Sequence, residues 1–535
     1  MSFANFVQGY STFNIENNED IMTKIFLYGP SGSGKSTVGK ILAQQTGLSF
    51  VDLDALIEER AGMPIPRIMS EQGEPAFRDQ ESAALRDVIA GETGLVALGG
   101  GALLRDENRA MAEAAGMVVF LQTGVDTLVA RLSADYSRPL LAGDIRERLT
   151  GLLERRKEHY GSFKTRFDTE TLEPSQIAWG IQVALGRFHI GGMGAAYDAI
   201  VEPGGLDRLG ALMRERGLEG PAAIVTESNV GPLYAGRAGA SLRAAGYETS
   251  TFTFEAGESS KTLENINRMW AAFLEGGLDR RSVVVALGGG VTGDMAGFAA
   301  ATFMRGVRWV GVPTSLLAMV DASLGGKTGI DLPQGKNLVG AFHPPSLVLA
   351  DPGLLASLSE AELCSGLAEV VKHGVIGDPG LFALCAAGME AIQRDLAAVV
   401  RRAMAVKAAV IEADPYERGQ RASLNLGHTV GHAVELVSEF KLRHGEAIAI
   451  GTVVEARLAE RLGLAGSGLA EEIAAALAGL GLPTHIPPEL PRDAIIAAMK
   501  VDKKKAAGVV KFALPVKIGE VKVGVAVEDL GMVFE

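Results

Sequence analysis

Apolar segments alternate with amphipathic segments along the first part of the chain. The apolar stretch KIFLYG, which begins at Lys24, predicts a buried strand. A glycine-rich loop, a helix (STVGKILAQQTG) and a second strand (LSFVDLD) follow it. Further strands are predicted at LVALGGG and MVVFLQT, and the alternation ends in a helix near 178–188. Strands that alternate with helices predict a parallel sheet with helices on both faces, so we expect an α/β domain over residues 23–185.

A second alternation begins near Tyr197, with predicted strands in AAIVTESNV, SVVVALGGG and VRWVGVPTS. After Pro352 the segments EAELCSGLAEVVKHGV and DLAAVVRRAMAVKAAVIEA have helical periodicity. The Gly/Ala-rich stretch HIGGMGAAYDAIVEPGG separates the two alternations. We therefore predict a linker over 186–196, an α/β lobe over 197–351 and an all-helical lobe over 352–535. The polar and acidic residues 1–22 are interpreted as a disordered extension.

Composition restricts the partners of the chain. The 535 residues include 51 Lys and Arg against 64 Asp and Glu, a net charge of −13 that disfavours non-specific nucleic-acid binding. Two cysteines give no disulfide framework, which favours a reducing, cytoplasmic compartment. Apolar runs are interrupted before the ~18–20 residues that a membrane span needs. We expect small-molecule partners, with neither nucleic acid nor membrane.

The segment Gly29–Ser36 (GPSGSGKS) matches G-x-x-x-x-G-K-[ST] between a predicted strand and a predicted helix. Backbone N–H groups of such a loop bind phosphates at the helix N-terminus. Lys35 would reach the β- and γ-phosphates, and Ser36 would be a ligand of Mg²⁺. The alternative, a glycine turn that only begins a helix, explains the complete pattern less well. The motif indicates a nucleoside triphosphate but not the acceptor.

Three downstream features concern the acceptor. Asp52 and Asp54 are predicted to point to one side of a strand end. Arg78 and Glu81 are spaced i,i+3 on a predicted helix and could equally be a surface pair. The glycines of Gly99–Gly101 allow the backbone to approach a ligand closely.

Together these motifs resemble shikimate kinase over roughly residues 24–185. The resemblance assigns ATP and Mg²⁺ to Gly32, Ser33, Gly34, Lys35, Ser36, Thr37 and Asp52. It assigns the hydroxyls and carboxylate of shikimate to Asp54, Arg78, Gly100 and Arg156. The stretch SRPLL resembles the family's lid motif, in which Arg138 stabilises the transferring phosphate. Lys35, Asp54 and Arg138 are the predicted catalytic residues.

The second part contains three groups of candidate residues. The segment Gly288–Gly293 (GGGVTG) matches G-x-G-x-x-G after a strand, but the acid expected about twenty residues later is absent, so a simple dinucleotide fold is doubtful. Lysines and glycines in DASLGGKTG and GKN suit a phosphorylated, carboxylated substrate, although single lysines are usually solvated. The segment LGHTVGH places His428 and His432 i,i+4 on one helical face, and spacing alone would nominate them as a metal pair.

These groups resemble 3-dehydroquinate synthase over roughly residues 197–530, in PTSLLAMVDASLGGKTGID, LNLGHTVGH, RHGEAIAIG and DKKK…FALP. The resemblance implies a homodimer and an NAD-binding lobe before a helical metal lobe, with Glu369, His428 and His444 as ligands of Zn²⁺ or Co²⁺. It assigns NAD to Glu227, Asn229, Glu258, Lys261, Gly289, Gly290, Val291, Asp294, Thr314 and Ser315. It assigns the substrate to Arg305, Lys327, Lys336, Asn337, Arg421, Asn425 and Lys503. The remaining catalytic assignments are Asp321, Lys327, Lys372 and His432.

The two resemblances imply two reactions. One is ATP-dependent phosphorylation of shikimate to shikimate 3-phosphate. The other converts 3-deoxy-D-arabino-heptulosonate 7-phosphate to 3-dehydroquinate and phosphate, with NAD⁺ taking a hydride and returning it. Another small-molecule P-loop kinase, a related sugar-phosphate cyclase or a metal polyol dehydrogenase would use similar motifs, and a non-catalytic scaffold is a further alternative. The acceptor residues and the KTGID…GKN stretch favour the first interpretation.

The predicted residues of each reaction lie wholly on one side of segment 186–196. Lys35→Ala is therefore expected to abolish phosphorylation of shikimate and to leave cyclisation nearly unchanged, because only the first reaction needs the lysine on a transferring phosphate. Both activities are measured on the same purified full-length chain. Equal loss of both activities in a folded variant would contradict the two-enzyme interpretation.

Overall fold

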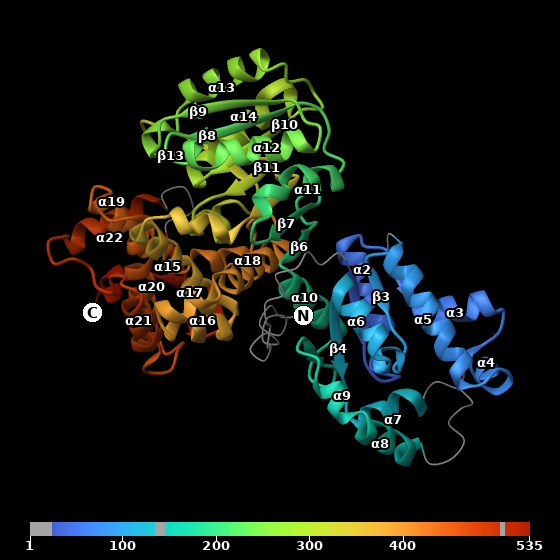
Figure 1. The fold of residues 1–535 in the computed structure, drawn as a ribbon. Helices are drawn as coiled ribbons and strands as arrows, with labels where there is room; N and C mark the ends of the chain where they lie inside the picture. Colours follow the sequence, from blue (N-terminus) through green and yellow to red (C-terminus); the bar gives the residue numbers. More distant parts are fainter. Residues whose placement is uncertain (1–23, 92, 134–144, 503–508, 535) are drawn as a thin grey trace. The chain divides into compact units, whose positions relative to one another are not determined.

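The computed structural model describes residues 24–91, 93–133, 145–502 and 509–534 (Figure 1). They form two compact units, which we call the N-terminal unit (24–185) and the C-terminal unit (186–534). Three predictions lie outside the described residues: the extension 1–22, Arg138 and Lys503. Among the described helices, none is long and apolar enough to cross a membrane.

The N-terminal unit is a five-stranded parallel sheet in the order β2-β3-β1-β4-β5. Its strands are β1 (Lys24–Tyr28), β2 (Phe50–Asp52), β3 (Leu95–Ala97), β4 (Gly116–Gln122) and β5 (Arg166–Asp168). Its helices are α2 (Lys35–Thr46), α3 (Leu53–Ala61), α4 (Ile65–Glu71), α5 (Glu74–Ala90), α6 (Asp106–Ala115), α7 (Val125–Ser133), α8 (Ile145–Arg155), α9 (Lys157–Gly161) and α10 (Pro174–Leu185). The predicted α/β class of this unit is confirmed.

Strand β1 divides the core of this unit into two layers, because successive side chains point to opposite faces. Phe26 and Tyr28 pack with residues of α3, α5 and α6. Ile25 and Leu27 pack on the other face with residues of α2 and α10. Both faces are covered, so β1 is buried along its whole length, and Gly29 follows the end of this central strand.

Two local predictions were wrong. Strand β2 ends at Asp52, which is the N-cap of α3 and accepts a hydrogen bond from the backbone N–H of Asp54. The two aspartates therefore do not share one side of a strand, since a capping aspartate begins a helix. The helix predicted near 178–188 ends at Leu185, and Arg187–Ile190, assigned to the linker, form strand β6. Alternate burial of Phe188 and Ile190 against strand β7 explains the change.

The C-terminal unit begins with a seven-stranded sheet in the order β6-β7-β14-β11-β10-β8-β9, in which only β6 is antiparallel to its neighbour. Besides β6, its strands are β7 (Tyr197–Val201), β8 (Ala222–Glu227), β9 (Thr249–Phe254), β10 (Val283–Gly288), β11 (Arg308–Pro313) and β14 (Leu347–Ala350). The helices of this lobe are α11 (Leu209–Glu215), α12 (Gly236–Ala244), α13 (Leu263–Glu275) and α14 (Gly290–Thr302).

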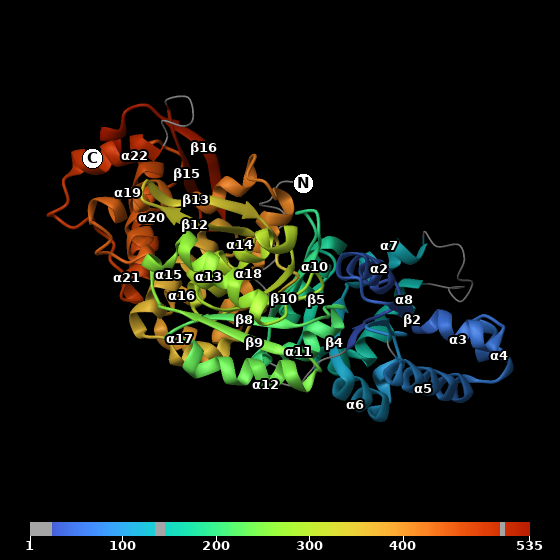
Figure 2. The same ribbon diagram turned by 90° about the horizontal axis from the view of Figure 1, so that it is seen from above.

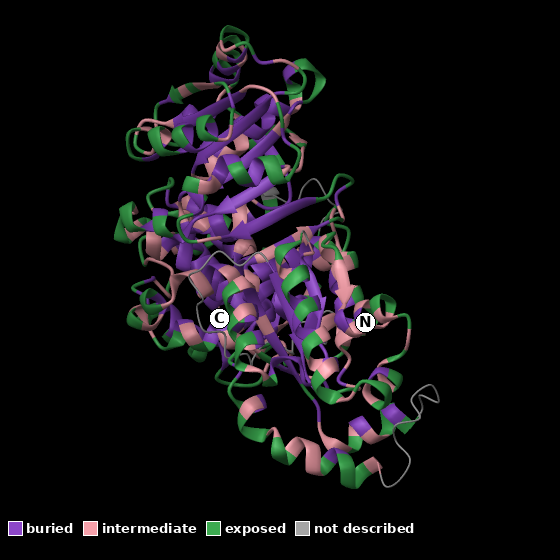
Figure 3. Cartoon of the chain, turned by 45° about the vertical axis from the view of Figure 1, so that its right-hand side comes forward, coloured by how far each residue is buried: buried purple, intermediate pink, exposed green. Residues whose placement is uncertain are grey.

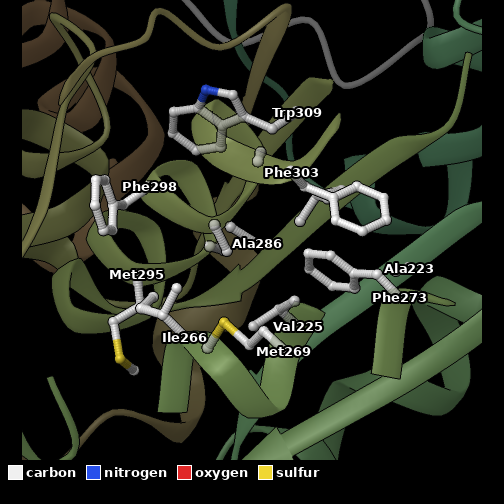
Figure 4. Packing of buried hydrophobic residues seen from close by; sticks show 14 of the residues in the cluster. Ala223, Val225, Ile266, Met269, Phe273, Ala286, Met295, Phe298, Phe303 and Trp309 are labelled. Carbon is white, nitrogen blue, oxygen red and sulfur yellow. The ribbon is translucent and has the colours of Figure 1, made fainter. Parts of the chain in front are cut away.

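One face of this sheet packs on α13 and α14, where Figure 4 shows Met269 and Phe273 with Ala286 and Phe303. The sheet strands are largely buried, whereas exposed residues gather on the outer helix faces (Figure 3). A hairpin, β12 (Lys327–Leu332) with β13 (Gly335–Phe342), contacts α14 and forms a separate two-stranded sheet.

The rest of the unit is the predicted helical lobe, which Figures 1 and 2 show towards the red end of the colour scale. Its helices are α15 (Glu360–Gly377), α16 (Pro379–Ala386), α17 (Met389–Arg394), α18 (Leu396–Ala413), α19 (His428–Val437), α20 (His444–Arg461), α21 (Leu469–Gly479) and α22 (Arg492–Asp502). The lobe is not entirely helical, because β15 (Val510–Lys517) and β16 (Glu520–Val527) form a hairpin. The buried side chains of Val510, Phe512 and Leu514 join the hairpin to the core of α19 and α20.

Helices α19 and α20 approach through glycine. A Cβ atom added at Gly451 of α20 would lie 2.0 Å from the carbonyl oxygen of Gly427. Gly451→Ala is therefore expected to lower the free energy of unfolding of the C-terminal unit by about 1–3 kcal/mol, although alanine is the better helix former. Denaturant unfolding of the purified protein measures this change.

Gly479→Ala is the matched control, because a Cβ atom at this exposed end of α21 would meet nothing within 4 Å. We expect no loss of stability in the control. Equal stability of Gly451→Ala and the parent protein would show that the two helices can separate without cost.

Candidate active sites

The glycine loop of the N-terminal unit joins β1 to α2, as predicted. Gly32 and Gly34 have φ of 86° and 93°, which a residue with a Cβ atom rarely adopts. Lys35 Nζ donates to the carbonyls of Gly29 (2.8 Å) and Pro30 (3.0 Å), so the ammonium group lies over the loop. Ser33 is buried within the loop, whereas Thr37 is exposed on the first turn of α2.

The two residues assigned to Mg²⁺ meet at one point. Ser36 Oγ donates to Asp52 Oδ2 over 2.6 Å. A hydroxyl and a carboxylate are oxygen ligands of the kind that Mg²⁺ takes beside nucleotide phosphates, so the donor set fits the ion. The capping role of Asp52 keeps its other oxygen, Oδ1, on the helix.

Arg131 was missed by the sequence analysis. It lies on α7 and donates to the carbonyls of Gly32 (3.3 Å) and Thr169 (2.9 Å). These contacts tie the phosphate loop to the segment that follows β5. Nothing in the local sequence of Arg131 distinguishes it from a surface arginine, so only the fold identifies it.

The acceptor residues surround the loop Gly99–Gly101. Arg78 Nη1 donates to Glu81 Oε2 over 2.8 Å, and Glu81 is only 1% exposed, so this is not a surface pair. A Cβ atom at Gly99 would lie 2.7 Å from Asp54 Oδ1, and one at Gly101 would lie 2.7 Å from Arg78 Nη2. Burial raises the pKa of Glu81 even though Arg78 opposes the shift.

The loop Gly99–Gly101 also contacts Arg156 and lies close to the phosphate loop. The carbonyl of Gly100 accepts hydrogen bonds from Arg156 Nη1 (2.7 Å) and Tyr160 Oη (2.9 Å). A Cβ atom at Gly100 would lie 3.2 Å from the carbonyl oxygen of Gly29. The fold thus brings Asp54, Arg78, Gly100 and Arg156 next to the phosphate loop. A phosphate donor and a carboxylated acceptor can meet there.

In the C-terminal unit, the residues assigned to NAD follow four neighbouring parallel strands. Glu227 is the last residue of β8 and Asn229 follows it, Glu258 and Lys261 follow β9, Gly289 to Asp294 follow β10, and Thr314 and Ser315 follow β11. The carboxyl ends of these strands lie at one edge of the sheet, which is where ligands of open α/β sheets bind.

Lys261 connects the predicted NAD residues with the predicted substrate residues. Its buried ammonium group lies 2.7 Å from Asp294 Oδ2 and donates to Asn337 Oδ1. Asn337 has φ of 56°, and its N–H donates to Asp331 Oδ1 over 2.7 Å. Burial lowers the pKa of Lys261, but Asp294, Glu258 and Asp331 raise it overall, so the lysine stays charged.

The predicted metal residues come from three helices. Glu369 of α15 is fully buried, and its Oε1 lies 3.7 Å from His428 Nε2 and 3.5 Å from His444 Nε2. His432 joins this group, since one ring nitrogen from each of the three histidines lies within 4.8 Å of the others. One carboxylate and imidazoles are the mixed oxygen and nitrogen donors that Zn²⁺ or Co²⁺ takes in catalytic sites, so the residues fit such an ion.

The charges of this group depend on one another. Burial would raise the pKa of Glu369, but Lys372 and the imidazoles hold it well below its usual range. Burial, together with Lys372, lowers the pKa of His428 to about 3. Burial would also lower the pKa of His444, but the neighbouring carboxylates of Glu369 and Glu435 raise it to about 9.

Cations assigned to the substrate lie around this centre, each beside an acid or a carbonyl. Lys327 Nζ lies 2.5 Å from Glu417 Oε2, and Asn425 Nδ2 donates to the other oxygen of Glu417. Lys336 Nζ lies 3.2 Å from Glu435 Oε1. Arg421 donates to the carbonyl of Pro415.

Two further predicted residues have different surroundings. Asp321 Oδ1 lies 2.6 Å from Lys407 Nζ and 4.0 Å from His373 Nε2. Arg305 is exposed at the end of the turn Phe303–Arg305, with φ of 72°. No hydrogen bond between the described residues joins Arg305 to the metal group, and its role in substrate binding stays a prediction.

Lys407, Glu417 and Glu435 are therefore members of the site that the sequence analysis missed. Each is the partner of a predicted residue. Lys407 lies within a helical segment, DLAAVVRRAMAVKAAVIEA, whose only sequence signal is its periodicity. These three residues could be identified only after the fold had brought their partners to them.

Comparisons with known proteins agree with this division. The family model for shikimate kinase matches residues 31–185. The models for the N-terminal and C-terminal parts of 3-dehydroquinate synthase match residues 251–365 and 366–505. A curated 3-dehydroquinate synthase from Symbiobacterium thermophilum is 47% identical over 333 residues, 61% of this chain and 93% of its own length. One from a Synechococcus strain is 45% identical over 337 residues, 61% of this chain and 92% of its own length.

Solved structures match the same unit. A 2-epi-5-epi-valiolone synthase from Streptomyces hygroscopicus with NAD⁺ and Zn²⁺ bound is 32% identical, with a TM-score of 0.57 over 63% of this chain and 94% of that one. A 2-deoxy-scyllo-inosose synthase complexed with carbaglucose-6-phosphate, NAD⁺ and Co²⁺ is 26% identical, with a TM-score of 0.57 and the same coverage. The sequence resemblances are thus confirmed: the chain belongs to the 3-dehydroquinate synthase family through its C-terminal unit, and its N-terminal unit is a shikimate kinase domain fused before it.

Proposed function

We propose that the N-terminal unit transfers the γ-phosphate of ATP to shikimate and that the C-terminal unit converts 3-deoxy-D-arabino-heptulosonate 7-phosphate to 3-dehydroquinate and phosphate. The observation that carries the proposal is the same in both units. Residues that are far apart in the sequence converge beside the phosphate loop in the N-terminal unit and around Glu369 in the C-terminal unit, and their charges match the proposed substrates.

In the N-terminal unit, the acceptor side supports a hydroxylated carboxylic acid. The guanidinium group of Arg78 is planar and suits a carboxylate, and Glu81 fixes its orientation through the 2.8 Å hydrogen bond. The carboxylate of Asp54 can accept a hydrogen bond from a substrate hydroxyl. Lys35 can neutralise charge on the transferring phosphate, which is the main requirement of phosphoryl transfer. Ser36 and Asp52 are the residues that would hold Mg²⁺.

In the C-terminal unit, Glu369, His428 and His444 would hold a divalent metal, and the residues along β8, β9, β10 and β11 would hold NAD. When bound, the metal supplies a Lewis acid for an alcohol or ketone oxygen, and NAD supplies a reversible hydride acceptor. The ammonium groups of Lys327 and Lys336 bind and neutralise the phosphate and carboxylate of the substrate. The imidazole of His432, in contact with the same group, can accept or donate a proton at a ring nitrogen.

The acceptor assignment predicts the effect of Arg78→Lys, which keeps a positive charge beside Glu81 and removes the planar fork. We expect kcat/KM for shikimate to fall by about 30-fold or more, the effect of losing about 2 kcal/mol from a desolvated carboxylate pair. The KM for ATP should remain unchanged. Steady-state kinetics with each substrate varied in turn measures both values.

Arg60→Ala is the control, since Arg60 pairs with Asp87 at an exposed site. It should leave the KM for shikimate unchanged. An unchanged shikimate dependence in Arg78→Lys would remove Arg78 from the acceptor site.

The metal assignment predicts different outcomes for two neighbouring histidines. A chelator is expected to abolish cyclisation, and Zn²⁺ or Co²⁺ to restore it, while kinase activity with excess Mg²⁺ survives. His444→Ala should lose the metal, because it removes a ligand, whereas His432→Ala should retain the metal and react slowly. Metal analysis of the purified variants distinguishes the two residues. Stoichiometric zinc in His444→Ala with none in His432→Ala would instead support the pair predicted from spacing alone.

A further inference from the structure

We propose that Glu435 is a positioning residue that couples the metal ligand His444 to the substrate-binding Lys336. One carboxylate oxygen orients the imidazole, and the other holds the lysine of the opposite lobe. The inference rests on the proposed metal and substrate assignments of the C-terminal unit, and it adds to them a residue with no assigned role.

The first contact fixes the orientation of His444. Glu435 lies on α19, and its Oε2 is 3.3 Å from His444 Nδ1. The other ring nitrogen, Nε2, lies 3.5 Å from Glu369 Oε1. A carboxylate on Nδ1 keeps the proton of the neutral ring on that nitrogen and leaves the Nε2 lone pair for a metal. Glu435 thus selects the nitrogen of His444 that points towards Glu369.

The second contact crosses from the helical lobe to the NAD-binding lobe. Glu435 Oε1 lies 3.2 Å from Lys336 Nζ, and the two residues are 99 positions apart in the sequence. Lys336 is the second residue of the largely exposed strand β13, where a lysine would otherwise be free to adopt many rotamers. The glutamate therefore restricts the ammonium group to the side of the metal residues.

The turn after α19 supports this position of Lys336. The ammonium group lies 4.3 Å from the ring centroid of Phe440, within the range of a cation–π interaction. Glu439 and Phe440 have φ of 56° and 60°, and two consecutive non-glycine residues rarely adopt this conformation. The N–H of Phe440 donates to the carbonyl of Glu435 over 2.9 Å, which ties the turn to the same glutamate. The strained backbone of Glu439 and Phe440 is thus found at the point where it places an aromatic ring against Lys336.

A single carboxylate with these two contacts links metal binding and substrate binding. A change at Glu435 should affect both, whereas a change at Lys336 should affect the substrate alone. If Glu435 served only the fold, replacing it would change neither the metal affinity nor the KM of the folded protein. The two effects are measured separately, on the full-length chain.

The first test is Glu435→Gln, which keeps the shape and removes the charge. We expect its affinity for Zn²⁺, measured by competition with a chelator, to fall about tenfold or more. At saturating Zn²⁺, the KM for the heptulosonate phosphate should rise about fivefold or more, because a charge-assisted contact to Lys336 is lost. Lys336→Met should raise the same KM and keep the Zn²⁺ affinity within about twofold of the parent protein.

Glu471→Gln is the matched control, since Glu471 lies on α21, its side chain is 76% exposed and its ion pair is with Arg457. It should change neither value. Unchanged Zn²⁺ affinity in Glu435→Gln, or an equal loss of affinity in Lys336→Met, overturns the proposal. If Glu435→Gln does not fold, Glu435→Asp, which keeps the charge and shortens the reach, is measured by the same criteria. The Zn²⁺ measurement needs no turnover, so a parent protein that binds Zn²⁺ but does not turn over the substrate contradicts the proposed function and not the orientation of His444.

Discussion

The carboxylate of Glu369 has no access to solvent, and a buried charge is stable only where opposite charges or hydrogen-bond donors compensate for lost hydration. Lys372, one turn further along α15, supplies the nearest positive charge. His428 and His444, at the first residues of α19 and α20, supply imidazole nitrogens at 3.7 and 3.5 Å. The beginnings of both helices must therefore meet the middle of α15. This requirement explains why the helices of this lobe pack so closely.

Glycine makes that packing possible. A Cβ atom at Gly445 would lie 2.0 Å from the carbonyl oxygen of Ser365, so α20 contacts α15 backbone to backbone beside His444. The N-terminal unit uses the same solution around another buried acid, Glu81, where Gly99 leaves room for the carboxylates of Asp54 and Glu81. In both units a side chain at the glycine would push apart the charged groups that form the candidate site. The high glycine content of the chain thus serves close approach as well as turns.

The sequence predicted those features that depend only on residues close together along the chain. The phosphate loop, the strand-to-helix glycine turns and the i,i+4 histidines are local patterns, and each lies where it was predicted. The predictions failed where a local pattern has two solutions. Asp52 ends β2 and also caps α3, so Asp54 lies in the helix, and Arg187–Ile190 pair with β7 instead of forming a linker. Long-range partners were not predictable. The contacts Lys407–Asp321, Lys327–Glu417 and Lys336–Glu435 join residues 86, 90 and 99 positions apart.

The pairing of site cations with carboxylates of the same chain bears on how a chain with a net charge of −13 could bind the anionic substrates that we propose. Its site cations lie beside its own carboxylates, as Arg78 does with Glu81 and Lys327 with Glu417. Such pairs hold each cation in one geometry and weaken its non-specific attraction for anions in solution. An anion gains full binding energy only by meeting several of these cations at once, because each contact must compensate for a weakened internal pair. For the proposed substrate, which carries both a phosphate and a carboxylate, we therefore expect selectivity to depend on the spacing of these pairs more than on the overall charge of the chain.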